Sequence, residues 1–313
     1  MKRRVLVSAP YFQPVVSRFE RLFAEADIEL VIPPVCERLN EEELLHLIPD
    51  LDGAICGDDQ FTERVLQAAP RLKVVAKWGT GVDSIDRQAA ARLGIAVCNT
   101  PNAFTDPVAD SVLGYILCFA RQLPWMDRDM RCQRWHKRPS ISLREATLGI
   151  IGVGNIGKAV ARRAATFGMR LLGNDVVSLP SDWLLDVGME AVSKAELLRQ
   201  SDFVSLNCDL NPTSFHLIAQ PDLALMKTSA YLINTARGPI IDEPALVRTL
   251  QKRGIAGAAL DVFETEPLPE ESALRSLDNV LLAPHNANSS PTAWERVHEN
   301  TIRQLLQHLA VHA

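Results

Sequence analysis

The feature that most constrains this sequence is a glycine-rich segment at residues 147–175, TLGIIGVGNIGKAVARRAATFGMRLLGND. It begins with a short apolar run rich in β-branched residues, which favours a buried strand. Gly152, Gly154 and Gly157 follow in G-x-G-x-x-G spacing, a helical apolar pattern comes next, and a second apolar run leads to Asp175. Strand, glycine turn, helix, strand and acid is the order that a dinucleotide-binding segment requires.

Each part of this segment has a chemical use. Glycines permit a tight turn and close approach of the backbone, so a pyrophosphate can bind the N–H groups at the helix N-terminus. Asp175 is expected to accept hydrogen bonds from the adenosine ribose hydroxyls and to repel a 2′-phosphate, and residues 176–180 contain no Arg or Lys. The alternative interpretation of the glycines alone is a turn of any α/β protein. The whole segment predicts NAD as the cofactor, in preference to NADP.

Composition and charge argue against several other classes of protein. The net charge of −5 gives no basic excess for nucleic acid, and the apolar runs are far shorter than the roughly 20 residues that cross a bilayer. The N-terminus starts like a signal peptide, but Pro10 interrupts its apolar run, which favours a first strand. The six cysteines show neither C-x-x-C pairs nor zinc-ligand spacing. We therefore expect a cytoplasmic protein with reduced thiols and no structural metal, nucleic-acid or membrane partner.

Strand and helix patterns alternate on both sides of the glycine segment, and a length of 313 residues favours two domains. Such alternation implies parallel sheets, so the predicted fold class is α/β with two doubly wound sheets. The first half predicts strands at 4–8, 28–32, 53–56, 72–77 and 96–99, and helices at 15–25, 41–48, 62–69 (capped by Thr62), 86–93 and 106–123. The second half predicts helices at 193–199, 221–226, 243–253 and 294–309, and strands at 203–206, 231–234, 256–261 and 280–282.

Two loops of the first half follow predicted strands. Residues 79–83, GTGVD, come after the fourth strand, and residues 99–102, NTPN, come after the fifth. Ligands of open α/β sheets bind beyond the carboxyl ends of the strands, so both loops are candidate substrate contacts. A glycine turn that merely connects two elements is the other interpretation.

A basic stretch at residues 124–146 interrupts the alternation, with Pro124 expected to stop the preceding helix. Nucleic-acid binding is one interpretation, but the stretch is short and the whole chain is acidic. A helix that packs on a partner subunit is favoured instead, because its large apolar side chains suit interface anchors: Trp125, Met126, Met130 and Trp135.

Three polar residues fall where successive strands of the second half end: Arg237, Glu266 and His285. Hydride transfer at a carbinol carbon needs a group that takes or gives the hydroxyl proton near neutral pH, and histidine suits this role. An arginine can bind a carboxylate through two parallel hydrogen bonds and polarise a carbonyl. A glutamate on the far nitrogen of the histidine fixes its tautomer. Each residue taken singly is also compatible with a cap or a surface group.

At this point the sequence resembles the D-isomer-specific 2-hydroxyacid dehydrogenases over nearly its whole length. The matching pieces are GTGVDSID at 79–86, TLGIIGVGNIG at 147–157, NTARGPIIDEPAL at 234–246, LDVFETEP at 260–267 and PH at 284–285. The resemblance implies that Arg237, Glu266 and His285 are catalytic, in agreement with the chemical argument. It also implies an NAD-dependent enzyme that interconverts a D-2-hydroxy acid and its 2-oxo acid.

The resemblance further implies the architecture and the cofactor contacts. A Rossmann-type cofactor domain at 101–286 would be inserted in a discontinuous, flavodoxin-like substrate domain at 1–100 and 287–313, with a homodimer formed through the cofactor domain. Asp261 would contact the nicotinamide amide. The remaining cofactor contacts implied are Asn155 and Ile156 at the pyrophosphate and Thr80, Cys208, Thr235 and Ala236 along the cofactor, beside Gly152, Gly154, Gly157 and Asp175.

The sequence motifs of the substrate side resemble those of phosphoglycerate dehydrogenases. We expect this chain to lack the regulatory C-terminal domain that some of those enzymes carry. Asp58 and Asp59 stand where phosphate-handling relatives tend to present a basic residue, and they would repel a phosphate unless they point away. Lys77, where many relatives carry Arg, is available to pair with an anionic tail. Phosphoglycerate, glyoxylate or hydroxypyruvate and longer acids all stay open. The predicted substrate contacts are Lys77, Gly79, Thr80, Gly81, Arg237 and His285.

Two alternative functions use the same scaffold. One is an NAD(H)-sensing binding protein similar to corepressors, which the intact set of catalytic residues disfavours. The other is an enzyme that oxidises phosphite.

Overall fold

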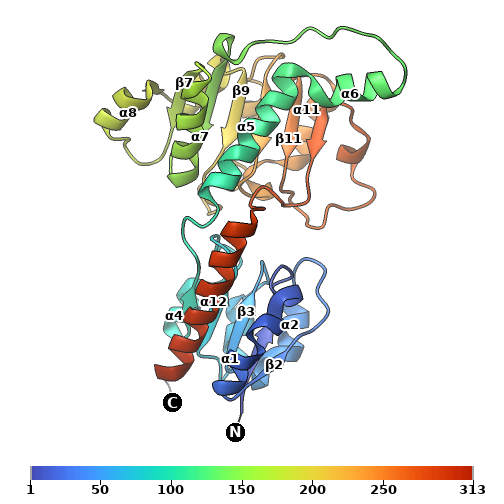
Figure 1. Cartoon of the computed structure of the whole chain (residues 1–313). Coiled ribbons are helices and arrows are strands. Elements are labelled where there is room, and N and C mark those ends of the chain that lie inside the picture. Colours follow the sequence, from blue (N-terminus) through green and yellow to red (C-terminus); the bar gives the residue numbers. More distant parts are fainter. Residues whose placement is uncertain (1, 312–313) are drawn as a thin grey trace. The chain divides into compact units, whose positions relative to one another are not determined.

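The computed structural model describes residues 2–311, and the chain divides into two compact units. Unit 1 comprises the chain up to Phe104 together with the residues from Ser290 onward, and unit 2 comprises Thr105–Ser289. In Figure 1, unit 1 is coloured blue to cyan with one red helix, and unit 2 runs from green to orange. Each unit is built around one parallel sheet, as the α/β alternation predicts.

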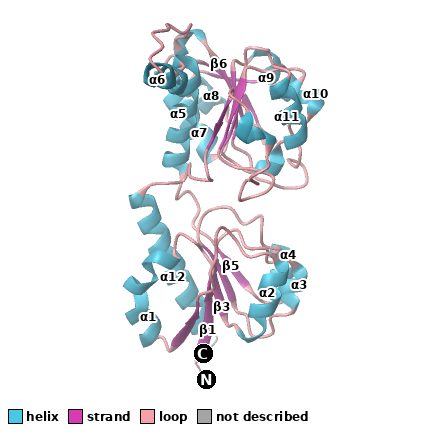
Figure 2. Ribbon diagram, turned by 90° about the vertical axis from the view of Figure 1, so that its right-hand side faces the viewer, coloured by secondary structure: helices cyan, strands magenta, loops and turns pink. Residues whose placement is uncertain are grey.

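The sheet of unit 1 has the strand order β2-β1-β3-β4-β5, which is the flavodoxin order. Helices cover both faces, with α1 and α12 on one side and α2, α3 and α4 on the other (Figure 2). The strands are β1 (Arg3–Val7), β2 (Ile28–Val31), β3 (Gly53–Cys56), β4 (Val74–Lys77) and β5 (Ala96–Cys98). The helices are α1 (Glu20–Glu25), α2 (Glu41–Leu47), α3 (Glu63–Gln67), α4 (Arg87–Arg92) and α12 (Pro291–Val311), with 3-10 turns at Gln13–Phe19 and Ile48–Asp50.

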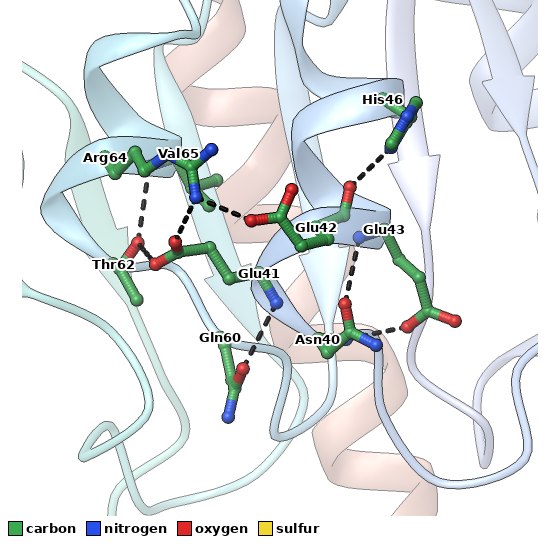
Figure 3. A network of polar contacts seen from close by, with 9 residues as sticks. All are labelled: Asn40, Glu41, Glu42, Glu43, His46, Gln60, Thr62, Arg64 and Val65. Atoms are coloured by element: carbon green, nitrogen blue, oxygen red, sulfur yellow. Dashed lines mark hydrogen bonds and ion pairs between the residues drawn. The ribbon is translucent and has the colours of Figure 1, made fainter.

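Polar contacts fix the starts of the short helices α2 and α3 (Figure 3). The side chain of the N-cap Asn40 accepts a hydrogen bond from Glu43 N, and the Glu43 carboxylate accepts one from Asn40 N. Thr62 caps α3, as predicted, by accepting a hydrogen bond from Val65 N. Arg64 joins the two helices through ion pairs with the acidic first turn of α2.

Helix α12 completes the core of unit 1 although it lies far from the rest of that unit in the sequence. It packs against β3, β4 and β5 and buries one apolar face. A Cβ atom built on Gly53 in β3 would lie 3.0 Å from Leu305 Cδ1, so the helix approaches the sheet closely. The buried side chains on this face include Ala293, Val297, Ile302, Leu305 and Leu309.

A buried histidine on α12 is tied to the residue that follows β4. Trp78 Nε1 donates a 3.0 Å hydrogen bond to His298 Nδ1, and both side chains are buried among aromatic rings. Burial lowers the pKa of His298; the charge of Glu295 opposes this shift and that of Arg18 adds to it. The neutral ring is therefore the form that the folded protein favours.

This burial predicts a loss of stability in acid. Because the pKa of His298 is lower in the folded chain than in the unfolded chain, its contribution is complete above about pH 6.5 and is lost as the pH falls towards the folded pKa. Urea unfolding at about pH 7.5 and about pH 5.5 is expected to show a smaller free energy of unfolding at the lower pH. His298→Gln, which keeps an acceptor for Trp78, should reduce this difference, whereas His308→Gln on the same helix should not.

The sheet of unit 2 has the order β12-β11-β10-β9-β6-β7-β8. Counted from β6, this is the Rossmann order 3-2-1-4-5-6 with a seventh strand added at the edge. Helices α5, α7 and α8 lie on one face and α9, α10 and α11 on the other. The strands are β6 (Thr147–Ile151), β7 (Arg170–Asn174), β8 (Met189–Ala191), β9 (Phe203–Leu206), β10 (Tyr231–Asn234), β11 (Gly257–Leu260) and β12 (Val280–Leu282). The helices are α5 (Thr105–Arg121), α6 (Leu123–Arg131), α7 (Asn155–Thr166), α8 (Ser181–Val187), α9 (Lys194–Gln200), α10 (Gln220–Leu223) and α11 (Glu243–Gln251), with 3-10 turns at Leu143–Glu145, Gly238–Ile240 and Ala273–Ser276.

The stretch after α5 differs from its prediction at Pro124. Gln122 adopts a left-handed φ of 55°, so α5 ends before it, and Pro124 lies in the first turn of α6, where proline is tolerated. Trp125 docks on its own unit, because it stacks on Phe119 and donates a hydrogen bond to Asp278 O. Its predicted role as an interface anchor stays a prediction. The buried Asp129 accepts hydrogen bonds from Arg134 and Arg138, which lower its pKa to about 2.

Two global features concern the described residues. All six cysteines are free thiols. Among residues 2–311, no helix combines the length and the apolar character that crossing a bilayer requires.

Candidate active site

The glycine segment forms a tight turn between β6 and α7. Gly152 has a φ of 86°, a conformation that L side chains rarely adopt, and a Cβ there would meet the backbone of Cys208 after β9. A Cβ on Gly157 would overlap the carbonyl of Gly152, so this glycine lets α7 pack directly on the turn. These two positions explain why the turn needs glycines whether or not a ligand binds.

The remaining glycine of the turn, Gly154, supports dinucleotide binding. A Cβ on Gly154 would meet no atom within 4 Å, so the small residue here leaves open space in front of the first turn of α7. The N–H groups of such a turn have no intrahelical acceptor and attract phosphate. This turn contains the predicted pyrophosphate contacts Asn155 and Ile156. At the end of β10, the buried hydroxyl of Thr235 has no hydrogen-bond partner in the described chain, which fits a contact supplied by a bound cofactor.

Asp175 follows β7 and anchors the turn from the other side. Its Oδ2 accepts a 2.6 Å hydrogen bond from Val153 N, and its Oδ1 accepts one from Val177 N at 3.0 Å. A carboxylate has lone pairs for further donors, so ribose hydroxyls are compatible with both contacts. Val176 and Val177 are exposed and bring no cation to this position, which fits NAD.

Removing the charge of Asp175 is expected to narrow the preference for NAD over NADP. Asp175→Asn and Asp175→Ala should both reduce the ratio of kcat/KM values for the two cofactors by at least about tenfold, because a carboxylate no longer faces the 2′-phosphate. Asp186→Asn removes the same charge from an exposed site on α8 and serves as the control. An unchanged ratio in both Asp175 variants would assign the selection to other residues.

Two further predicted cofactor contacts lie at the ends of β9 and β10. Cys208 lies against Gly152, and burial raises the pKa of its thiol to about 11, with smaller contributions from Asp209 and Asp175. The neutral thiol acts here as a small packing group rather than as a nucleophile. The backbone N–H of Ala236 donates to the side chain of the buried Asn234, which holds this loop in place.

The three predicted catalytic residues follow three neighbouring strands of unit 2. Arg237 comes after β10, Glu266 lies in the loop after β11, and His285 comes after β12, and these strands are adjacent in the sheet. Because the strands are parallel, their carboxyl ends meet at one edge. The structure therefore brings the three residues to the same edge of the Rossmann sheet as the glycine turn.

Glu266 and His285 are in direct contact. His285 Nδ1 lies 3.0 Å from Glu266 Oε2, and the two side chains are only 19% and 14% exposed. The second carboxylate oxygen accepts a 2.9 Å hydrogen bond from Phe263 N, which fixes the glutamate against its own loop. A carboxylate at Nδ1 fixes the tautomer and the orientation of the ring.

Asp261 holds the turn that carries His285. Its carboxylate is 1% exposed and accepts hydrogen bonds from Asn286 N and Ala287 N, both at 2.9 Å. His285 N donates to the Asp261 carbonyl at 2.7 Å, and His285 has a φ of 50°. Burial raises the pKa of Asp261, while the two backbone N–H groups oppose that shift. The family resemblance implied a contact between Asp261 and the nicotinamide amide. The hydrogen bonds from Asn286 N and Ala287 N to Asp261 were not predicted, because no local sequence pattern encodes them.

Arg237 lies in a loop that is braced on both sides. Asn234 Nδ2 donates to the carbonyl of Arg237 at 2.8 Å, and Arg237 Nη1 donates to Ala236 O. A Cβ on the next residue, Gly238, would overlap the backbone of Phe263 and Glu264. The arginine turn and the loop that carries Glu266 are therefore in direct backbone contact, and only glycine allows it.

In unit 1, the two acids that follow β3 have different partners. Asp59 is fully buried and accepts hydrogen bonds from Ser8 Oγ, Leu39 N and Gly57 N, and burial raises its pKa against these contacts. Lys77, at the end of β4, is buried and pairs with Asp58 at 2.9 Å.

The predicted substrate loop follows Lys77 directly. Gly79 has a φ of 131°, and Thr80 donates a hydrogen bond from its hydroxyl to Thr100 O. The side chain of Asn99 in turn donates to Thr80 O, so the loops at 79–81 and 99–100 brace one another. Gly81 completes the turn, half-buried.

Comparisons with known proteins agree with this geometry. The family described as "D-isomer specific 2-hydroxyacid dehydrogenase, NAD binding domain" matches residues 113–287. A glyoxylate reductase of Thermofilum pendens is 40% identical over 85% of this chain and 81% of its own length. A D-3-phosphoglycerate dehydrogenase of Methanocaldococcus jannaschii is 37% identical over 93% of this chain and 54% of its own length. The crystal structure of a D-lactate dehydrogenase from Aquifex aeolicus, complexed with NAD and lactic acid, has a TM-score of 0.84 at 29% identity and covers 96% of this chain and 93% of that one.

Proposed function

Because the chain belongs to the D-isomer-specific 2-hydroxyacid dehydrogenases, we propose that it acts on a short, unphosphorylated acid such as glyoxylate or hydroxypyruvate. The reaction class follows from the family itself. The protein is an NAD-dependent oxidoreductase that interconverts a D-2-hydroxy acid and the corresponding 2-oxo acid.

We assign the chemical roles to the residues at the edge of the unit 2 sheet. Arg237 binds the substrate carboxylate through its planar guanidinium and polarises the C2 carbonyl. His285 gives a proton from Nε2 to the carbonyl oxygen during reduction and takes it back during oxidation. Glu266 orients the ring and stabilises its protonated form through the 3.0 Å contact to Nδ1. Bound NADH supplies the hydride for C2.

The Asp58–Lys77 pair carries the substrate proposal. Lys77 is the cation closest to the Gly79 turn in the sequence, and its ammonium lies 2.9 Å from an acid of its own unit. The pair carries no net charge. The neighbouring Asp59 is an acid bonded to Ser8 and supplies no positive charge for a phosphate. A phosphate dianion would have to compete with Asp58 for Lys77, and the negative charge of Asp58 would repel the phosphate. A small uncharged substituent on the 2-oxo acid meets no such penalty.

The substrate proposal is tested by measuring kcat/KM with glyoxylate, hydroxypyruvate, pyruvate and 3-phosphohydroxypyruvate in the presence of NADH. We expect the best unphosphorylated acid to exceed 3-phosphohydroxypyruvate by at least about tenfold. Phosphite with NAD forms a further arm and is expected to give no turnover. Preference for the phosphorylated acid would contradict the substrate proposal, whereas inactivity with every 2-oxo acid would contradict the roles assigned to the catalytic residues.

A charge variant sharpens this test. Asp58→Asn keeps the shape of the side chain and leaves Lys77 without its carboxylate partner, so the preference should shift towards the phosphorylated acid by about fivefold. Asp27→Asn removes an equal charge before β2, at the opposite end of the parallel sheet, and should leave the ratio unchanged.

We also propose a cytoplasmic homodimer formed through unit 2. Free thiols fit a reducing compartment. The stretch after α5 exposes large apolar side chains, with Trp135 at 84% and Met130 at 53%, and a second copy of unit 2 would cover them. Size-exclusion chromatography with light scattering tests the dimer, and Trp135→Ser with Met130→Ser should weaken it.

A further inference from the structure

The loop that carries the catalytic glutamate contains a second carboxylate with a different set of contacts. Glu266 points to His285 and to its own loop. Glu264 instead contacts His216 Nε2 at 2.8 Å and accepts a 3.1 Å hydrogen bond from Glu243 N. The backbone N–H of Glu264 donates to the Glu243 carboxylate at 3.1 Å, so the loop and the start of α11 are joined twice.

This arrangement keeps three carboxylates close together. Burial and the charges of Glu264 and Glu266 raise the pKa of Glu243. Repulsion of this kind pushes a loop outward unless other groups oppose it. Two groups do so here: the positive end of α11, whose first residue is Glu243, and the imidazole of His216. The backbone N–H of His216 donates a hydrogen bond to Pro239 O, which holds this residue in place.

The point of attachment is the place where the two catalytic loops touch. Gly238 follows Arg237, and a side chain at that position would overlap the backbone of Phe263 and Glu264. A shift of Glu264 therefore displaces the backbone against which Gly238, next to Arg237, is packed. It also displaces the loop that carries Glu266. Displacements of about 1 Å in a catalytic group cost up to about 100-fold in rate.

We propose that Glu264 and His216 form a positioning pair for catalysis: the pair holds the loop that aligns Glu266 with His285 and supports the turn of Arg237. The proposal rests on the dehydrogenase reaction of this family and is independent of which 2-oxo acid is the substrate. Neither side chain is assigned a contact with substrate or cofactor.

The test compares Glu264→Ala, Glu264→Gln and the matched control Glu270→Ala, an exposed acid of the same loop region. With the best 2-oxo acid and saturating NADH, we expect Glu264→Ala to lower kcat about tenfold, with the KM for that acid and the Kd for NADH changed less than about twofold. Glu264→Gln keeps an oxygen acceptor for Glu243 N and His216, so it should restore kcat to within about threefold of the parent. Glu270→Ala should match the parent.

His216→Asn gives a second route to the same result. Asparagine tolerates the positive φ of 49° at this position but is too short to reach Glu264, so folding is preserved while the contact is lost. We expect about a fivefold loss of kcat, and in the double variant with Glu264→Ala a loss no larger than that of Glu264→Ala alone.

Full kcat in Glu264→Ala, an equal loss in Glu264→Gln, or multiplying losses in the double variant would each overturn the proposal. A loss confined to KM or to Tm would do the same, because it would assign the pair to substrate binding or to stability. Failure of the substrate proposal changes which acid is used in the assay and leaves these ratios intact.

Discussion

Replacing His285 by alanine is expected to lower kcat about 1000-fold while the affinity for NADH changes little. The histidine is held at Nδ1 by Glu266, and its turn is held by Asp261, so the imidazole has a fixed place at this edge of the sheet. Loss of the imidazole removes the proton donor but leaves the glycine turn and Asp175 untouched. Steady-state turnover of the best 2-oxo acid and NADH fluorescence titration measure the two quantities.

Two controls make this result specific. His308→Ala removes a histidine of α12 that has no part in the site and should leave kcat unchanged. Glu266→Gln keeps a side chain of the same shape beside His285 and should reduce kcat less than the loss of His285 does. Near-parental turnover of His285→Ala would refute the assignment of the proton donor.

The substitution Gly238→Ala is expected to reduce kcat about 100-fold and to destabilise the fold by about 3 kcal/mol. The added methyl group would overlap the backbone of Phe263 and Glu264, which a side-chain rotation cannot relieve. One of the two loops must therefore move, and either movement changes the position of Arg237 relative to Glu266. Urea unfolding and turnover at saturating substrate measure the two effects.

Gly114→Ala is the matched control. Its Cβ meets no atom within 4 Å on α5, where alanine favours a helix more than glycine does. This variant should be as active as the parent and slightly more stable. A Gly238→Ala enzyme with full activity would show that the close approach of the two loops is unimportant for catalysis.

Most of the sheet architecture could be predicted from the sequence because its strands are buried on both faces. Continuous apolar runs identify β3, β9 and β10 with the bounds that the structure shows. The edge strand β8 was missed, since it is three residues long and buries only Met189. The break at Gln122 was also missed, because a left-handed residue between two helices leaves no apolar pattern.

The candidate site divides in the same way. The common place of Arg237, Glu266 and His285 at one edge of the sheet could be predicted because each follows a recognisable strand, and their catalytic roles stay predictions. The direction of a carboxylate could not: nothing local shows that Asp59 turns into the core or that Asp58 binds Lys77. The contact between Glu264 and His216 joins residues that are 48 positions apart, and only the folded chain brings them together.

The insertion of unit 2 within unit 1 has a consequence for the order in which the two halves mature on the ribosome. All of unit 2 has been synthesised once Ser289 has been added, but unit 1 still lacks the helix that covers β3, β4 and β5. The part of its sheet that α12 covers is therefore still exposed at this stage, until Val297, Ile302 and Leu305 arrive. During vectorial synthesis the nucleotide-binding half is complete first, and the half that begins the chain is the last to close its core.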